Sequence, residues 1–82
     1  MQSVEIASLE FLERLCERGE ALIPHGGFFY SAQELVKSGL AQVVGTWGGI
    51  ADVIKPSPLG IQLNEIRKAL LNRGNDDNHA SA

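Results

Sequence analysis

Cysteine and histidine are scarce in this chain of 82 residues, which holds one cysteine, Cys16, and two histidines. A single cysteine forms no intramolecular disulfide, and a zinc site needs about four cysteine or histidine ligands. Cys16 and His25 are the only nearby pair of nucleophile and base. Cys16, however, falls on the apolar side of a predicted helix, where cysteine usually fills core space. We therefore expect no enzymatic activity, no metal ion and no cofactor.

The chain also lacks a basic excess and a long apolar run. Its 7 basic residues are outnumbered by 10 acidic ones, for a net charge of -3, which gives no general attraction to phosphate. No apolar stretch approaches the roughly 20 residues that span a bilayer. Glu5, Glu10 and Glu13 interrupt the first segment, unlike a signal peptide. We expect a cytoplasmic protein that contacts neither membrane nor nucleic acid.

The apolar spacing predicts one domain over residues 1–73 and a disordered polar tail over residues 74–82. Its fold class is α+β, in the order α-β-α-β-β-α with an antiparallel hairpin. The predicted elements are a helix over residues 3–18, a strand over 21–23, a turn over 25–27, a helix over 31–39, strands over 40–44 and 50–54 around a loop over 45–49, and a helix from 58 to about 72.

Local signals mark the ends of these helices. Ser3, Ser31 and Ser57 are suited to begin them, and Ser31 stands three residues before Glu34, the pattern of a capping box. Gly19 and Gly39 are suited to end helices in the left-handed conformation. The apolar face of the first helix is predicted to contain Ile6, Leu9, Phe11, Leu12, Leu15 and Cys16.

Two runs of residues resemble winged-helix proteins. Residues 33–40, QELVKSGL, resemble the end of the recognition helix, where a Gly-Leu pair starts the first wing strand. Residues 54–60, IKPSPLG, resemble the start of the closing helix, as in regulators of the multiple-antibiotic-resistance type. The resemblance covers about half of the chain and implies a small winged-helix-like domain. It also implies an alternative function, a dimeric DNA-binding regulator that reads the major groove through Ser31, Gln33 and Lys37.

The features with which that family binds DNA are incomplete in this sequence. Pro24, Gly26 and Gly27 leave no ordinary helix before the helix at Ser31, although a helix-turn-helix needs one. The wing loop over residues 45–49 has no arginine or lysine to meet phosphate. The sequence therefore favours a reduced winged helix that does not bind DNA.

Aromatic residues supply the remaining candidate site. Trp47 either folds back on the wing strands or forms an exposed contact at the hairpin tip, and tryptophan is enriched among interface hot spots. Phe28, Phe29 and Tyr30 cannot all point inward from an extended segment. We expect Trp47, with Thr46, Phe29 and Tyr30, to form a patch for a protein partner or a second copy of the chain.

The sequence thus favours a protein-binding module without catalysis. In size and charge it resembles accessory proteins of phages and mobile elements, among them anti-CRISPR proteins, some of which disable a host complex by binding it. The implied function is a small inhibitor or adaptor that binds a host protein. A minor subunit of a larger assembly is a third reading, and the identity of the partner is left open.

Overall fold

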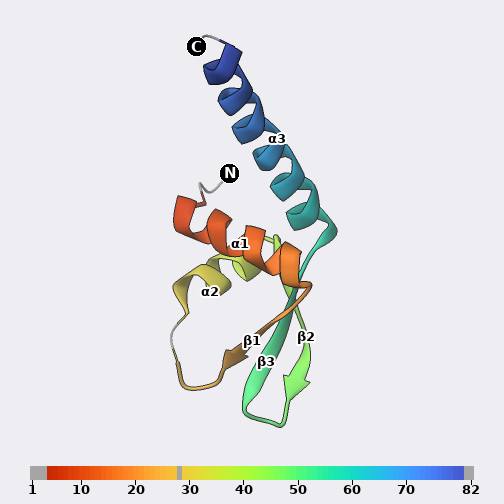
Figure 1. The fold of residues 1–82 in the computed structure, drawn as a ribbon. Helices are drawn as coiled ribbons and strands as arrows, with labels where there is room; N and C mark the ends of the chain where they lie inside the picture. Colours follow the sequence, from red (N-terminus) through yellow and green to blue (C-terminus); the bar gives the residue numbers. More distant parts are fainter. Residues whose placement is uncertain (1–3, 28, 81–82) are drawn as a thin grey trace.

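A computed structural model describes residues 4–27 and 29–80, with side chains described as far as Arg73. The chain forms three helices and three strands in the predicted order (Figure 1), which confirms the α+β class and is consistent with a small winged-helix-like fold. The elements are α1 (Ile6–Arg18), β1 (Ala21–Pro24), α2 (Tyr30–Lys37), β2 (Ala41–Trp47), β3 (Ala51–Pro56) and α3 (Pro58–Ala80).

The strands form one antiparallel sheet in the order β1-β3-β2. The predicted loop over residues 45–49 is wrong in extent, because β2 continues to Trp47 and only a tight turn separates it from β3. Gly48 and Gly49 form this turn with φ of 60° and 71°, and the N–H of Ile50 donates to the oxygen of Trp47 at 3.1 Å. Positive φ at both central residues is the pattern of a type I′ turn, which suits the twist of paired strands.

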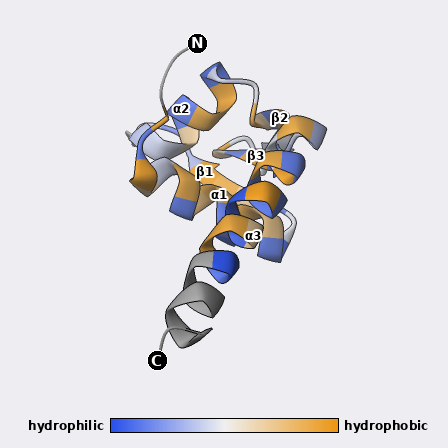
Figure 2. Ribbon diagram, turned by 90° about the horizontal axis from the view of Figure 1, so that it is seen from above, coloured by the Kyte–Doolittle hydropathy of each residue, from blue (hydrophilic) through white to orange (hydrophobic). Residues whose placement is uncertain are grey.

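The core lies where α1 and α2 meet the upper part of the sheet (Figures 1 and 2). Its buried apolar residues are Leu12, Leu15, Ala32, Leu35, Leu40, Ala41 and Ile54. The first helix differs from prediction, since Ile6 is 69% exposed and Ser8 is fully buried. A long-range contact between the start of α1 and Glu34 on α2 holds this end of the helix against the domain.

That contact also overturns the predicted capping box. Helix α2 begins at Tyr30, and no side chain in the described part of the chain forms the N-cap hydrogen bond predicted for Ser31. The Glu34 carboxylate instead accepts the backbone N–H of Glu5 at 3.0 Å, at the start of α1. The predicted cap Ser3 lies outside the described residues. Glu34 therefore accepts a backbone N–H at the N-terminal end of α1 and does not cap its own helix, α2.

The joint between β3 and α3 follows the sequence prediction. The Oγ of Ser57 accepts the backbone N–H of Gly60 at 3.0 Å, as an N-cap does, and donates to the oxygen of Gly39 at 2.6 Å. Gly39 has φ of 77° and Gly19 has φ of 90°, as predicted for residues that end helices. A backbone bond from Ser57 to the oxygen of Leu40 at 3.0 Å completes this joint.

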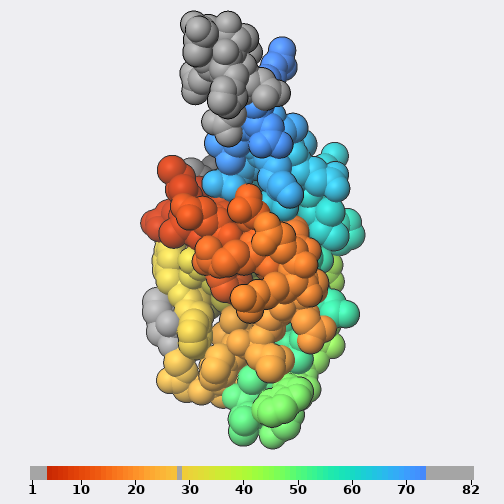
Figure 3. All heavy atoms as spheres, viewed as in Figure 1, coloured from red at the N-terminus to blue at the C-terminus, as the bar shows by residue number. Residues whose placement is uncertain are grey.

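Helix α3 rises away from the rest of the domain (Figures 1 and 3). It continues to Ala80, whereas the sequence predicted an end near residue 72 and a disordered tail beyond it. No proline follows to stop the helix, and Gly74 inside it costs only about 1 kcal/mol relative to alanine. Residues 81–82 lie outside the described part. Among the residues described, no helix combines the length and the apolar character needed to cross a membrane.

Candidate partner-binding surface

Trp47 lies at the end of β2 with its side chain 57% exposed. It pairs across the hairpin with Ala51, which pairs on its other side with Pro24. Residues that oppose each other in a sheet share a face, so Trp47, Ala51 and Pro24 lie side by side. Ala51 is buried between these larger neighbours. Of the two readings that the sequence left open, the structure supports the exposed indole.

The strand that carries Trp47 is an edge of the sheet. Because β3 occupies the centre, the outer side of β2 has no strand partner within the described residues. Every residue from 42 to 47 is exposed, and β2 contains neither charge nor proline. Natural edge strands are usually protected by such residues or by a bulge. Here only an irregularity in the register between Val43 and Gly45 interrupts the edge.

Thr46 is also exposed but lies on the other face of the sheet. It pairs with Asp52, which pairs with Ile23, and side chains alternate along each strand. Thr46 and Trp47 therefore extend from opposite sides of the same edge. A partner that contacts both must wrap around the strand.

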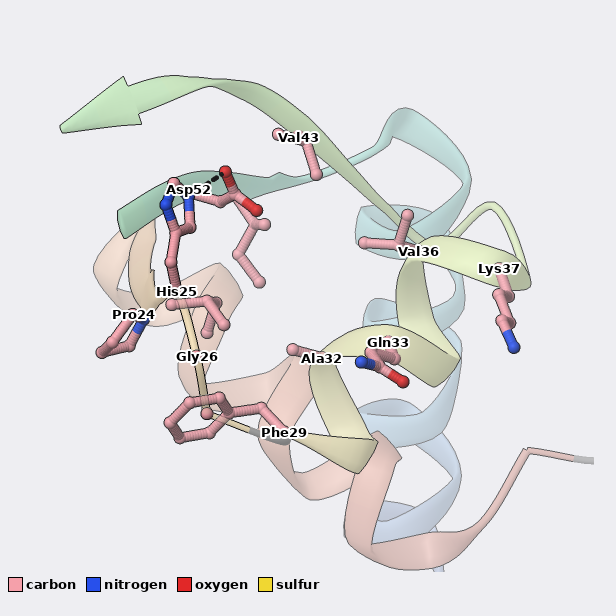
Figure 4. A pocket seen from close by; sticks show the side chains of 13 residues that line it. Pro24, His25, Gly26, Phe29, Ala32, Gln33, Val36, Lys37, Val43 and Asp52 are labelled. Carbon is pink, nitrogen blue, oxygen red and sulfur yellow. Dashed lines mark hydrogen bonds and ion pairs between the residues drawn. The ribbon is translucent and has the colours of Figure 1, made fainter. Parts of the chain in front are cut away.

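Phe29 lies in a cleft of about 450 Å³ between α2 and the sheet, and Trp47 does not line it (Figure 4). Its ring covers Gly27, where an added Cβ would come within 2.6 Å of the ring carbon Cε2. Across the cleft, His25 Nε2 and Asp52 Oδ1 are 2.8 Å apart. The remaining walls are Ile23, Pro24, Gly26, Ala32, Gln33, Val36, Lys37, Val43 and Ile54. Phe29 and Trp47 therefore do not line one pocket, although Pro24, which lines the cleft, lies in the same row across the sheet as Trp47.

Tyr30 lies at the junction of α1 and α2. Its hydroxyl donates to the Glu34 carboxylate at 3.1 Å and approaches that of Glu5 at 3.4 Å. The hydrogen bond to Glu34, together with the charges of Glu34 and Glu5, raises the pKa of Tyr30. Phe29 and Tyr30 thus stand side by side at the start of α2 with their side chains in different contacts, and Trp47 lies at the end of β2. Phe28 lies outside the described residues. No local pattern predicted the contact of Tyr30 with Glu5, because the two residues are distant in sequence.

The candidate nucleophile and base are not brought together. His25 contacts Asp52, while Cys16 lines a separate hollow on α1 with Glu17 and Lys68. Burial, followed by the charge of Glu65, raises the pKa of the Cys16 thiol, which lowers the share of reactive thiolate. Among the side chains described in residues 4–27 and 29–73, no three histidine, cysteine, aspartate or glutamate residues gather to hold a metal ion.

The residues of the DNA-binding alternative lie along α2. Gln33 and Lys37 are exposed and Ser31 is half-buried. Lys37 extends from the end of the helix, away from the middle of the cleft (Figure 4), and is the only cation of α2. The described part of the loop before α2 forms no helix. One cation on this helix is little charge for binding a phosphate backbone.

The chain matches no protein-family model, no curated protein and no solved structure.

Proposed function

We propose that this chain is a non-enzymatic protein-binding module, a small cytoplasmic inhibitor or adaptor of phage or mobile-element origin, that binds a host protein through its wing hairpin. The observation that carries the proposal is the exposure of Trp47 at the end of an uncharged, unpaired edge strand. Ile50, on the other side of the turn, is 61% exposed and enlarges the apolar surface.

The energetics favour a partner at this position. Burying a large aromatic side chain gives roughly 1.5–3 kcal/mol from area alone, and truncation of a hot-spot residue costs about 2 kcal/mol or more. Within the free domain, Trp47 already leaves more than half of its side chain in water. The indole therefore contributes little to the domain's own core and has most of its surface left for a partner.

The edge of β2 adds a second means of recognition. Unpaired N–H and C=O groups along an edge strand accept an extended segment as a further strand. Val43 and Val44 are exposed beside these groups and have the high β-propensity that suits such pairing. A partner could thus bind the backbone of β2 while it covers Trp47.

The test compares binding by the wild type, Trp47→Ala and a matched control, Ile6→Ala. Ile6 is also more than half exposed but lies on α1, away from the wing. The partner is captured from the native cell, identified by mass spectrometry, purified and titrated by calorimetry. We expect Trp47→Ala to weaken binding at least tenfold, about 1.4 kcal/mol, and Ile6→Ala to leave it unchanged. Unfolding free energies should change by less than about 1 kcal/mol.

Two results would overturn the proposal. If Trp47→Ala binds as tightly as the wild type, the wing is not the contact surface. If instead the protein forms a specific DNA complex tighter than about 10⁻⁸ M, the alternative of a DNA-binding regulator is correct. Trp47 emission offers a direct check, because an exposed indole should shift to the blue when the partner covers it.

A further inference from the structure

The cleft between α2 and the sheet has an apolar interior. Ile23 lines it from β1, Ile54 from β3, Val36 from α2 and Val43 from β2. Val43 is 52% exposed, so the wall formed by β2 has apolar surface that the domain does not cover. The volume of about 450 Å³ lies within the roughly 300–1,000 Å³ of ordinary ligand pockets. The cleft therefore has room for a ligand with an apolar part.

One carboxylate faces this space. Among the described residues that line the cleft, Asp52 is the only acidic one. Its Oδ1 accepts from His25 Nε2 at 2.8 Å, because a carboxylate oxygen has no proton to donate. The second oxygen, Oδ2, accepts no hydrogen bond from any described residue, and in Figure 4 it points away from the His25 ring. Asp52 is 40% exposed and so offers this oxygen to a donor that enters the cleft.

The only lysine or arginine among the described residues of the cleft lies on the other side. Lys37 and Asp52 are on opposite sides of the cleft, and Lys37 extends away from its middle (Figure 4). Lys37 therefore does not occupy the position beside Asp52. Its charge instead disfavours a ligand cation at the α2 end and favours one at the Asp52 end. The net charge of the chain, -3, acts in the same direction.

Phe29 adds an aromatic surface on the side of Asp52. The ring packs over Gly27 and is 41% exposed, and in Figure 4 it lies on the side of the cleft away from Lys37. Aromatic rings attract cations, and arginine more often than lysine. The cleft thus combines an accepting oxygen, an aromatic ring and apolar walls.

We propose that this cleft binds the side chain of an arginine of the protein partner, with the guanidinium donating to Asp52 Oδ2 and the alkyl stem packed against Val43 and Ile54. Arginine buries an apolar stem while its head remains with a charged group, and its planar head both pairs with carboxylates and packs on aromatic rings. A neutral apolar side chain would cover the Asp52 carboxylate without pairing it, which is unfavourable. An acidic side chain would be repelled.

The place of the cleft agrees with the contact proposed for the wing. Thr46 pairs with Asp52, and opposed residues share a face of the sheet. A partner that wraps around β2 from Trp47 to Thr46 therefore reaches the face on which the cleft opens. The identity of the arginine as a residue of the partner rests on the proposed function, whereas the chemistry of the cleft does not.

The first test needs no partner. The probe is n-propylguanidinium, which has the carbon chain and head of an arginine side chain, and binding to the free protein is followed by amide NMR at about pH 8, where free imidazole is uncharged. We expect the signals of residues 23–27 and 52–54 to shift. Asp52→Asn keeps an oxygen for His25 but loses the charge, and it should weaken binding about fivefold, the upper range for a partly exposed ion pair.

A matched variant and a matched probe control this test. Glu20→Gln removes the same charge, but Glu20 does not line the cleft, so it should bind the probe as the wild type does. The neutral n-propylurea should bind the wild type more weakly than n-propylguanidinium, a comparison that needs no variant to fold. Equal binding of the two probes, equal weakening by the two substitutions, or no shift at the cleft would overturn the proposal.

The second test uses the purified partner and separates the two proposals. Asp52→Asn should weaken partner binding about fivefold, and Glu20→Gln should leave it unchanged. If n-propylguanidinium binds the cleft while Asp52→Asn binds the partner normally, the cleft takes a free guanidinium compound and the assignment to a partner arginine is wrong. If Trp47→Ala binds the partner normally while Asp52→Asn does not, the wing proposal fails and the cleft proposal stands.

Discussion

Gly60 is the position where a single added methyl group should destabilise the fold most. It lies in the first turn of α3, and a Cβ built there would overlap the backbone oxygen of Leu40, with the carbonyl carbon at 2.9 Å and Leu12 Cδ1 at 3.3 Å. A side-chain end could move aside, but this carbonyl is fixed, because it accepts the N–H of Ser57 at 3.0 Å. Gly60→Ala must therefore displace α3 or break that bond.

The magnitude follows from two unfavourable effects and one favourable effect. Overpacking a filled site costs about 1–3 kcal/mol, and leaving a buried backbone group unpaired costs a further 1–3 kcal/mol or so. Replacing glycine by alanine stabilises the helix by up to about 1 kcal/mol, because alanine has the higher helix propensity. We expect a net loss of about 2–4 kcal/mol. In a domain whose total stability is on the order of 4–12 kcal/mol, such a loss brings the protein close to unfolding.

The assay is urea denaturation followed by circular dichroism, with Gly45→Ala as the control. Gly45 lies in β2 without a positive φ, and a Cβ added there meets no atom within 4 Å. The control should unfold within about 0.5 kcal/mol of the wild type. If Gly60→Ala is as stable as the wild type, or more stable, helix propensity outweighs the overlap and the described approach of α3 to Leu40 is wrong.

Two further predictions concern hydrogen bonds. Ser57→Ala removes the N-cap of α3 and the hydrogen bond to Gly39, so it should lower the free energy of unfolding by about 2 kcal/mol in the same denaturation assay. The control Ser31→Ala removes no cap and should change this free energy little; equal losses would contradict the assignment of the caps. The Ser8 hydroxyl, followed by the Glu5 N–H, holds the pKa of Glu34 below its ordinary value of 4.5. The stabilisation that the Glu34 carboxylate gives the fold is therefore complete above that value, and it is lost as the pH falls through the lower pKa of the folded state. NMR titration of the Glu34 carboxyl should show the lowered midpoint, and Glu34→Gln should remove this part of the acid dependence; an ordinary midpoint would refute the contact with α1.

The sequence predicted features that depend on neighbouring residues. Ser57 and Pro58 signalled the start of α3, and Gly39 its preceding turn, because capping and positive φ are local properties. Glu34 was assigned to the wrong partner, since Glu5 is distant in sequence and competes successfully with Ser31. The exposure of Trp47 depends on which strand lies at the centre of the sheet, and no local pattern sets that order.

The joint at Ser57 has a consequence for how force and motion pass through the molecule. Its hydrogen bonds tie the end of α2, the start of β2 and the first turn of α3 together within a few residues. These three segments should therefore exchange their amide hydrogens as one slow unit. The hairpin tip, which is connected to them only through β2 and β3, should exchange faster. A force applied at the hairpin tip should therefore bend the hairpin before it changes the orientation of α3 relative to α2.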